Sequence, residues 1–241
     1  MAACLLEVAA NSLASALVAQ EGGAGRIELC TALELGGLTP SHAQIALVRE
    51  RVRLPLYVLV RPRAGDFLYS DLEFETMRRD IEACAALGCD GVVIGVLDAD
   101  GEVDLTRCRA LVAAAGRMGV TFHRAFDMAR DLSRALEDVI ALGAERVLTS
   151  GGARSAMEGG ACIRTLIELA GDRLTIMPGA GVAPGNIARL KALTGAQEFH
   201  ASAKRQLSSA MRMTSAVLAD MASGEIRTDV DTVRALVAAL S

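Results

Sequence analysis

The stretch ALGAERVLTSGG (residues 141–152) carries the repeated pattern that decides the fold. Its first residues end a predicted helix, Gly143 makes the turn, and Arg146–Thr149 form a short strand. The same arrangement recurs in ALGCDG (residues 86–91) and in EGGAGR (residues 21–26), where glycine again separates a helix from a strand. A helix that leads back to the start of another strand is the usual connection within a parallel sheet.

This helix–strand unit repeats along the whole chain. Short runs rich in leucine and β-branched residues predict strands at Cys4–Val8, Arg26–Leu29, Leu56–Val60, Gly91–Gly95, Val120–Phe122, Arg146–Thr149, Leu174–Met177 and Gln197–His200. The segments between them place apolar residues on one helical face and predict helices at Ser12–Gln20, Ser41–Arg51, Asp71–Leu87, Leu105–Ala115, Leu132–Leu142, Ala153–Ala170 and Ala183–Leu193. Asp229–Leu240 predicts a further amphipathic helix that closes the chain.

The number of units predicts the architecture. Eight strand–helix units in 241 residues, 52% of them hydrophobic, fit a single (β/α)8 barrel domain over residues 1–241, with an extra C-terminal helix. The alternative is a doubly wound open sheet. Such sheets have five or six strands, and the first strand here is not followed by the GxGxxG turn that many of them carry. We therefore expect the barrel.

Composition excludes several classes of protein. Lys+Arg number 25 and Asp+Glu 29, which gives a net charge of −4, and only Lys191 and Lys204 are lysines. We expect no nucleic-acid surface, and no strand ends in the lysine that a Schiff-base enzyme needs. No run of about 18 uncharged apolar residues could span a membrane. The six cysteines form no CxxC pair, so we expect reduced thiols in the cytoplasm and no structural zinc site.

Catalytic groups in a (β/α)8 barrel gather at the carboxyl ends of the strands. The polar residues predicted at these ends are Glu7, Glu28, Cys30, Arg61, Arg63, Asp98, His123, Arg124, Ser150, His200 and Ser202. Glu7 and Glu28 lie on neighbouring strands, where each carboxylate raises the pKa of the other. Either is a candidate general base, with His123 as the acid or a metal ligand. Alternatively, these charges pair with one another and only close the barrel mouth.

The stretch MPGAGVAPGNI (residues 177–187) is the clearest signal for an anion. Gly179 and Gly181 allow backbone N–H groups to turn toward a ligand, in a loop that often binds phosphate in such barrels. LTSGG (residues 148–152) makes a second glycine-rich turn. Side chains that would join the glycines in binding a small anionic substrate, phosphorylated ones included, are Arg61, Arg63, Arg124, Ser150, His200 and Ser202. Alternatively, the glycines only make tight turns.

Several longer motifs resemble those of the copper homeostasis protein CutC family. They are RIELCTALELGGLTPS (residues 26–41), RPRAGDFLYSD (61–71), VLDADGEVD (96–104), TFHRAFD (121–127), RVLTSGG (146–152), MPGAGV (177–182) and EFHASA (198–203). These motifs occur in order over about the first 205 residues. The resemblance implies a single (β/α)8 barrel, a cytoplasmic location, a dimer, and a role in copper binding or trafficking.

The resemblance also implies Cu(I) ligands at two neighbouring strand ends, each a cysteine. This chain keeps Glu28-Leu29-Cys30 at the second strand but has Ala9 where the family has the first cysteine. Cu(I) prefers thiolate and thioether ligands. We therefore predict that Cys30, with His123 or His200 beside it, makes only a weak copper site.

Three functions remain open at this point. The first is copper homeostasis through Cys30. The second is an enzyme that acts on a small anionic substrate at the barrel mouth, and the third is a structural dimer whose polar rim is incidental. We also expect a homodimer, because the apolar segment Ala210–Met221 has no place in the eightfold repeat and suits a partner surface.

Overall fold

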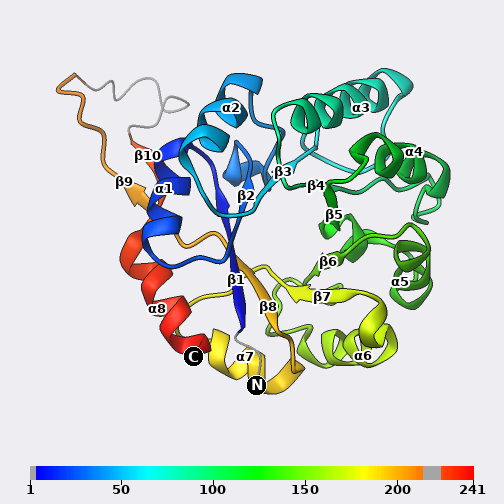
Figure 1. Ribbon diagram of the computed structural model, residues 1–241. Helices are drawn as coiled ribbons and strands as arrows, with labels where there is room; N and C mark the ends of the chain where they lie inside the picture. The colour runs from blue at the N-terminus through cyan, green and yellow to red at the C-terminus, as the bar shows by residue number, and fades with distance from the viewer. Residues whose placement is uncertain (1–3, 214–223) are drawn as a thin grey trace.

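In the computed structural model, eight parallel strands form a ring that helices surround on the outside (Figure 1). The structure describes residues 4–213 and 224–241. The strands are β1 (Leu5–Ala10), β2 (Arg26–Leu29), β3 (Leu56–Leu59), β4 (Gly91–Ile94), β5 (Gly119–Phe122), β6 (Arg146–Thr149), β7 (Thr175–Pro178) and β8 (Glu198–Ala201). They pair in the order β7-β6-β5-β4-β3-β2-β1-β8, and β7 contacts β8 where the ring closes. The predicted (β/α)8 barrel is confirmed.

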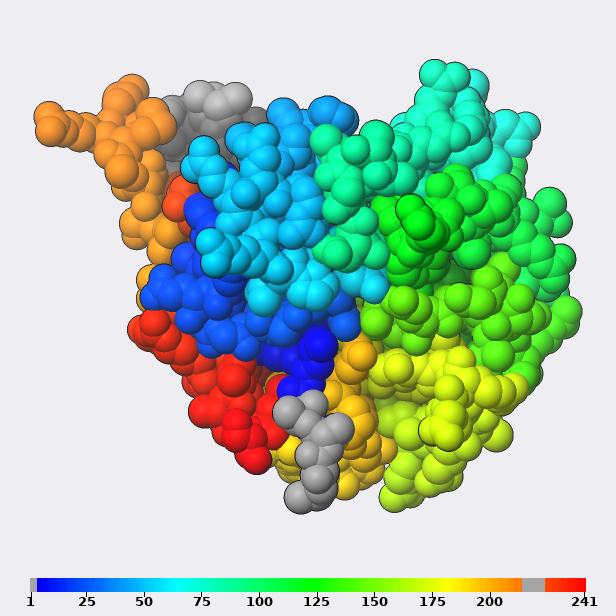
Figure 2. All heavy atoms as spheres, in the orientation of Figure 1, coloured from blue at the N-terminus to red at the C-terminus, as the bar shows by residue number. Residues whose placement is uncertain are grey.

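The helices cover the outer face of the strands. They are α1 (Leu13–Glu21), α2 (His42–Arg51), α3 (Asp71–Ala86), α4 (Leu105–Ala115), α5 (Leu132–Ala141), α6 (Gly160–Ala170), α7 (Ile187–Thr194) and α8 (Val230–Leu240). α8 packs against α1 and α7, and Figure 2 shows it (red) on the surface beside the first part of the chain (blue). The C-terminal helix that the sequence predicts as an extra one therefore fills the eighth place in the ring. No helix in the described residues is long and apolar enough to cross a membrane.

A short antiparallel strand pair lies between β8 and α8. It consists of β9 (Lys204–Leu207) and β10 (Glu225–Thr228). In Figure 2 the chain that follows β9 (orange) projects away from the barrel. Most of Ala210–Met221, for which we expect a dimer contact, lies outside the described residues. The homodimer therefore stays a prediction.

Helices α6 and α7 begin later than their sequence pattern predicts, and not at Ala153 and Ala183. The residues before them form loops instead, with one tertiary hydrogen bond between the loops and a local side-chain turn before α7. The amide of Ala156 donates to the carbonyl of Ala180 (3.0 Å). The side chain of Asn186 accepts a hydrogen bond from the amide of Ala183 (2.9 Å). The two loops are thereby tied together at the carboxyl ends of β6 and β7.

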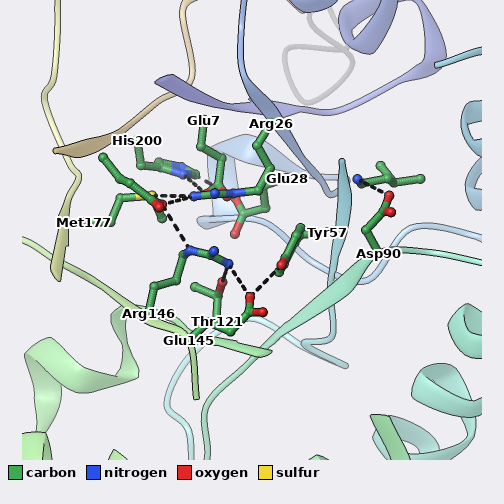
Figure 3. A network of polar contacts seen from close by, with 12 residues as sticks. Glu7, Arg26, Glu28, Tyr57, Asp90, Thr121, Glu145, Arg146, Met177 and His200 are labelled. Atoms are coloured by element: carbon green, nitrogen blue, oxygen red, sulfur yellow. Dashed lines mark hydrogen bonds and ion pairs between the residues drawn. The ribbon is translucent and has the colours of Figure 1, made fainter. Parts of the chain in front are cut away.

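Side chains of the strands alternate between two environments. Those that face outward pack against the helices and build an apolar core, with Val8, Ile27, Leu29, Val58 and Val92 among them. Those that face inward are largely polar or charged: Glu7, Arg26, Glu28, Tyr57, Thr121, Arg146 and His200 (Figure 3). Glu198 joins them through its bonds with Arg26 and Arg146. Barrel interiors are ordinarily filled by branched apolar side chains. The interior of this barrel is therefore unusually polar, and its buried charges need partners inside the ring of strands.

Arg26 holds the interior together from the second strand. Its Nε donates to Glu7 Oε2 and its Nη2 donates to Glu198 Oε2, both at 2.5 Å (Figure 3). Arg146 also donates to Glu198 Oε2, at 3.1 Å, so one carboxylate is shared between two guanidinium groups. The ring of Tyr57 lies 5.4 Å from the Arg26 guanidinium and 4.9 Å from that of Arg146. Every charge in this layer therefore has a partner, which is the condition under which burial is tolerated.

We predict that Arg26→Met destabilises the protein strongly. Glu7 is fully buried, and the substitution would leave its carboxylate without its cationic partner. Loss of one member of a buried pair costs about 3–5 kcal/mol. The control is Arg234→Met, which breaks an exposed pair with Glu21 and should cost less than about 1 kcal/mol. Chemical denaturation of both variants measures the difference, and equal losses would contradict the assigned role of Arg26.

Candidate functional site

A cavity of about 690 Å³ opens at the carboxyl ends of the strands. Most of the residues proposed from the sequence line it: Glu28, Cys30, Arg61, His123, Arg124, Gly181, His200 and Ser202. Five do not: Glu7, Arg63, Asp98, Ser150 and Gly179. The expectation that functional groups gather at the carboxyl ends of the strands therefore locates the cavity. Which of these side chains point into it is seen only in the structure.

The floor of the cavity is a carboxylate–imidazole–carboxylate chain. His200 Nδ1 lies 2.8 Å from Glu7 Oε1, and its Nε2 lies 3.6 Å from Glu28 Oε2 (Figure 3). Glu7 comes from β1, Glu28 from β2 and His200 from β8, so three adjacent strands place them. The ligand atoms of this trio all lie within 4.8 Å of one another. Glu7 already receives hydrogen bonds on both oxygens, from Arg26 and from His200, and it orients the imidazole.

The two carboxyl groups have different charge states. Burial alone would raise the pKa of Glu7, but the hydrogen bond from His200 and the charge of Arg26 lower it to about 2. Burial raises the pKa of Glu28 to about 7, and the negative charge of Glu7 adds to this, against the opposing effect of His200 and Arg26. Glu7 is therefore a fixed anion and a poor base. Glu28 is the carboxyl group that changes charge near neutral pH.

His200 lies between the two carboxyl groups and responds to both. Burial opposes the charged imidazolium, but the negative charges of Glu28 and Glu7 raise the pKa of His200 above its ordinary value. A proton bound to either nitrogen would therefore face a carboxylate. Because Glu28 Oε2 lies 3.6 Å from Nε2, beyond hydrogen-bond distance, Glu28 and the imidazole interact through their charges.

His123 follows β5 and is almost completely buried. Its Nδ1 accepts a hydrogen bond from the amide of Ala125 (3.1 Å), which assigns the ring proton to Nε2. Within the described residues, Nε2 has no hydrogen-bond partner. Burial and the nearby charge of Arg61 lower the pKa of His123 to about 3. His123 therefore presents a neutral N–H group, and it is not the imidazolium acid that the sequence suggests.

Arg61 holds the loops at the rim of the cavity in position. Its guanidinium donates to the carbonyls of Leu35, Gly37 and Gly65, each at 2.9 Å, and stacks on the ring of Phe67. These bonds tie together the loops that follow β2 and β3. Only Nε lacks a partner among the described residues. Arg61 therefore shapes the rim of the cavity, and little of its charge is free for an anion.

Arg63 points away from the cavity, contrary to its expected role in anion binding. Its guanidinium pairs with Asp66 and Glu73 at 2.9 and 2.6 Å. Glu73 belongs to the capping box at the start of α3, in which Ser70 bonds its backbone amide. Arg63 therefore anchors the loop between β3 and α3 on the outside of the barrel.

Arg124 and Ser150 are joined through Asp127, a residue that the sequence argument missed. Asp127 accepts hydrogen bonds from Arg124 Nε (2.7 Å), Thr149 Oγ1 (2.5 Å) and the amides of Ser150 (3.0 Å) and Gly152 (3.1 Å). Ser150 is fully buried in this network. Arg124 is about half-exposed at the rim and keeps part of its guanidinium toward the cavity. The only sequence signal for Asp127 is its place in TFHRAFD (residues 121–127).

The loop after β7 approaches the floor closely. A Cβ at Gly179 would lie 2.4 Å from the terminal Cδ1 of Leu148, so a larger residue would require the Leu148 side chain to move, and 3.4 Å from Cβ of His200, which is ordinary contact. Ala180 (φ 76°) and Gly181 (φ 72°) then turn in the left-handed region and line the cavity. Gly179 therefore makes room for Leu148 beside His200, and Gly181 provides the cavity wall.

Cys30 is a buried thiol on the same strand as Glu28. Burial raises its pKa well above the ordinary value, and the charges of Glu28 and Glu34 add to the effect. Among the described residues that line the cavity, the other sulfur belongs to Met128, and Ala9 occupies the corresponding wall of β1. A neutral thiol with no second cysteine fits Cu(I) poorly.

Comparison with known proteins agrees with the fold and the motifs. The family model described as CutC family matches residues 4–205. The chain belongs to the CutC family. A family protein CutC from Chromobacterium violaceum is 59% identical over 208 residues, which cover 86% of this chain and 84% of that protein. One from Xylella fastidiosa is 56% identical over 236 residues, covering 98% of this chain and 88% of the relative.

A mouse relative and a solved structure extend the comparison. The Mus musculus protein named copper homeostasis protein cutC homolog is 47% identical over 219 residues, which cover 91% of this chain and 80% of that protein. The crystal structure of a CutC protein from Streptococcus agalactiae superposes with a TM-score of 0.79 at 30% identity, covering 83% of this chain and 98% of the other. A thiamine phosphate pyrophosphorylase from Pyrococcus furiosus, at 16% identity and a TM-score of 0.61, shares the fold alone.

Glu28→Gln tests the charge state of the cavity floor. The pKa of Glu28 in the folded protein, about 7, exceeds the ordinary value of 4.5, so the folded state holds the proton more tightly than the unfolded state. Stability therefore falls as pH rises between these two values. We expect Glu28→Gln to stabilise the protein by about 2–3 kcal/mol near pH 8 and by little near pH 4.5. Denaturation curves at both pH values measure this.

A matched control comes from the same rim. Glu34 is an exposed carboxylate in the short helical turn Leu33–Leu35, so Glu34→Gln should change stability little and equally at both pH values. A Glu28→Gln variant with the same effect at both pH values would show that the carboxyl is not held neutral by its surroundings.

Proposed function

We propose that the mouth of this CutC-family barrel is a catalytic site that transfers a proton on a small anionic molecule containing a carbonyl group. The observation that carries the proposal is the state of Glu28. Its side chain is 94% buried, it lies at the floor of a cavity, and no described residue hydrogen bonds it. A carboxyl group whose pKa lies near the working pH is the group best suited to general acid–base catalysis.

The proposed reaction moves a proton without any co-reactant. The Glu28 carboxylate takes a proton from the carbon next to the carbonyl, and the electron pair of that C–H bond becomes the enolate. The same carboxyl group, or His200 beside it, returns a proton to the carbon framework. An isomerisation or epimerisation of this kind balances in atoms and electrons, and the cavity has to supply only a base and a donor to the oxygen.

His123 supplies the donor in this proposal. Its Nε2–H has no acceptor among residues 4–213 and 224–241, and its low pKa keeps it neutral at working pH. A neutral imidazole can polarise a carbonyl and stabilise the enolate oxygen without competing as an acid. Glu28 and His123 would therefore divide the work of base and electrophile, while Glu7 holds His200 in place.

The anionic part of the substrate would lie at the rim. Arg124, Gly181 and Ser202 line the cavity and remain candidates for this role. Arg61 joins them through its positioning of the loops after β2 and β3. The six cysteines are free thiols, which supports our placing this activity in the reducing cytoplasm.

Proton exchange in D2O tests the proposal. The probe is a panel of small carbonyl acids and phosphorylated carbonyl compounds. Proton NMR follows the loss of signal from the hydrogen on the carbon next to the carbonyl, as deuterium replaces it. We expect exchange with the wild type and a loss of about 100-fold or more in Glu28→Gln, the scale of a missing general base. Glu34→Gln is the control and should exchange normally. Exchange that survives in Glu28→Gln would rule out its role as base.

Copper binding is the second candidate, because the mouse relative is named for copper homeostasis and Cys30 lies in the cavity. With a single thiol of raised pKa, we predict weak Cu(I) binding that is lost in Cys30→Ser. Competition against a chromophoric Cu(I) chelator should leave nearly all the copper on the chelator. Tight stoichiometric binding that disappears in Cys30→Ser would favour copper over the enzymatic function.

A further inference from the structure

We infer that the loops after β7 and β8 bind a phosphate group, so that the substrate of the proposed reaction is a small phosphate monoester. The inference rests on the proposed function only in treating this cavity as the substrate site. Its own basis is a set of hydrogen-bond donors that converge on one wall of the cavity and have no acceptor in the described protein.

The backbone after β7 provides the first donors. Ala180, Gly181 and Val182 are consecutive and all line the cavity. None of the hydrogen bonds within the described residues uses their amides as donors, although the amides on either side, of Gly179 and Ala183, both have acceptors. Successive left-handed residues turn neighbouring N–H groups toward one side, and this is a recurrent way to hold an anion.

The chain after β8 adds two side chains. Ser202, in the loop after β8, and Lys204, the first residue of β9, line the same cavity, and no described residue hydrogen bonds the Ser202 hydroxyl or pairs with the Lys204 ammonium. Nearly every arginine near the mouth is already engaged: Arg63 with two carboxylates, Arg124 with Asp127, and Arg61 with backbone carbonyls. Lys204 is therefore the cation with the most charge available to an incoming anion.

A deeply buried group indicates independently that the cavity is built for a ligand. His123 is more than nine-tenths buried, it lines the cavity, and its Nε2 has no hydrogen-bond partner among the described residues. Glu28 is equally buried, and its charged neighbour His200 Nε2 lies 3.6 Å away, beyond hydrogen-bond distance. Buried polar groups without partners are uncommon in folded proteins, and a ligand is one of the few arrangements that satisfies them.

The geometry links the phosphate wall to the proton site. Gly179, the residue before the free amides, lies against His200 so closely that a Cβ would be 3.5 Å from its Cδ2. A phosphate on the amides of Ala180–Val182 therefore lies beside the imidazole that contacts Glu28. The reacting carbon would be only a few bonds from the phosphate, and a short-chain phosphate ester meets that condition.

Cavity size and lining favour such a small ester over a nucleotide. About 690 Å³ is the size of an ordinary small-molecule pocket. Besides the imidazoles of His123 and His200, the aromatic side chain that the described lining offers is Phe67, and Arg61 and His123 already pack on it, at 5.3 and 5.0 Å. A nucleotide base would find no free ring to stack on.

Inorganic phosphate is the probe for the first experiment. Titration of 15N-labelled protein at constant ionic strength should shift the amide signals of Ala180, Gly181 and Val182 together, with one dissociation constant. Sulfate should compete with phosphate. Acetate has fewer acceptor oxygens and less charge, so it should bind at least about tenfold more weakly than phosphate. Shifts confined to other parts of the chain, or equal binding of acetate, would overturn the phosphate site.

Side-chain variants identify the donors. Lys204→Ala and Ser202→Ala should each weaken phosphate binding, by about tenfold and about threefold respectively, with little effect on folding because both positions are at least partly exposed. Arg117→Ala is the matched control: it removes one positive charge from an exposed turn before β5, at the other end of the barrel. Equal weakening by Arg117→Ala would mean that phosphate senses only the net charge.

Glu28→Gln separates this inference from the proposed reaction. If the phosphate wall exists, the variant still binds inorganic phosphate with the same amide shifts, whether or not proton exchange occurs. Phosphate binding without any exchange on the carbonyl panel would contradict the proposed reaction and leave the phosphate site intact. Proton exchange on the carbonyl panel without phosphate binding would contradict the phosphate site and leave the proposed reaction intact.

Discussion

The buried pairing of Arg26 with Glu7 and Glu198 is the interaction on which the rest of the barrel depends. A guanidinium inside a ring of strands is stable only where carboxylates surround it, and both are supplied by strands that meet at the closure of the barrel. The pairing also fixes Glu7 as an anion, and Glu7 in turn orients His200. The charge state of the cavity floor thus follows from a contact one layer deeper in the barrel.

The interior is divided into a satisfied layer and an unsatisfied one. Toward the amino ends of the strands, Arg26, Arg146 and Glu198 complete each other's hydrogen bonds and charges. Toward the carboxyl ends, Glu28 has only His200 Nε2 at 3.6 Å, and His123 Nε2 has no hydrogen-bond partner among the described residues, although both side chains are as buried as the groups below them. Burial of unpaired polar groups costs stability, and the apolar shell between strands and helices offsets that cost. A merely structural plug would resemble the lower layer, which is why the upper layer indicates a ligand site.

Much of the architecture could be predicted from the sequence, because the spacing of apolar residues and the residue types that make turns are local features. The strand Arg146–Thr149 and the helix Leu105–Ala115 match the structure at both ends, since glycine turns and N-caps mark their limits. The directions of Arg61 and Arg63 could not be predicted, because carbonyls and carboxylates of folded loops compete with the cavity for a guanidinium. The same holds for Lys204, which the sequence places only beyond the last strand. Its position at the cavity depends on how β9 leaves the barrel.

Backbone strain is distributed unequally between the two ends of the barrel. At the amino ends of the strands, the turns that need a positive φ use glycine, as at Gly88, Gly143 and Gly195. Among the described residues, the non-glycine residues with a positive φ are Ala32, Ala180 and Ala203, and these follow β2, β7 and β8 at the mouth. An alanine in this conformation costs about 1 kcal/mol that glycine would avoid. Such a cost is retained where a particular backbone direction matters more than stability. The mouth carries that cost on the same strands that carry Glu28 and His200, as expected where the loops are shaped for a ligand and not for the fold alone.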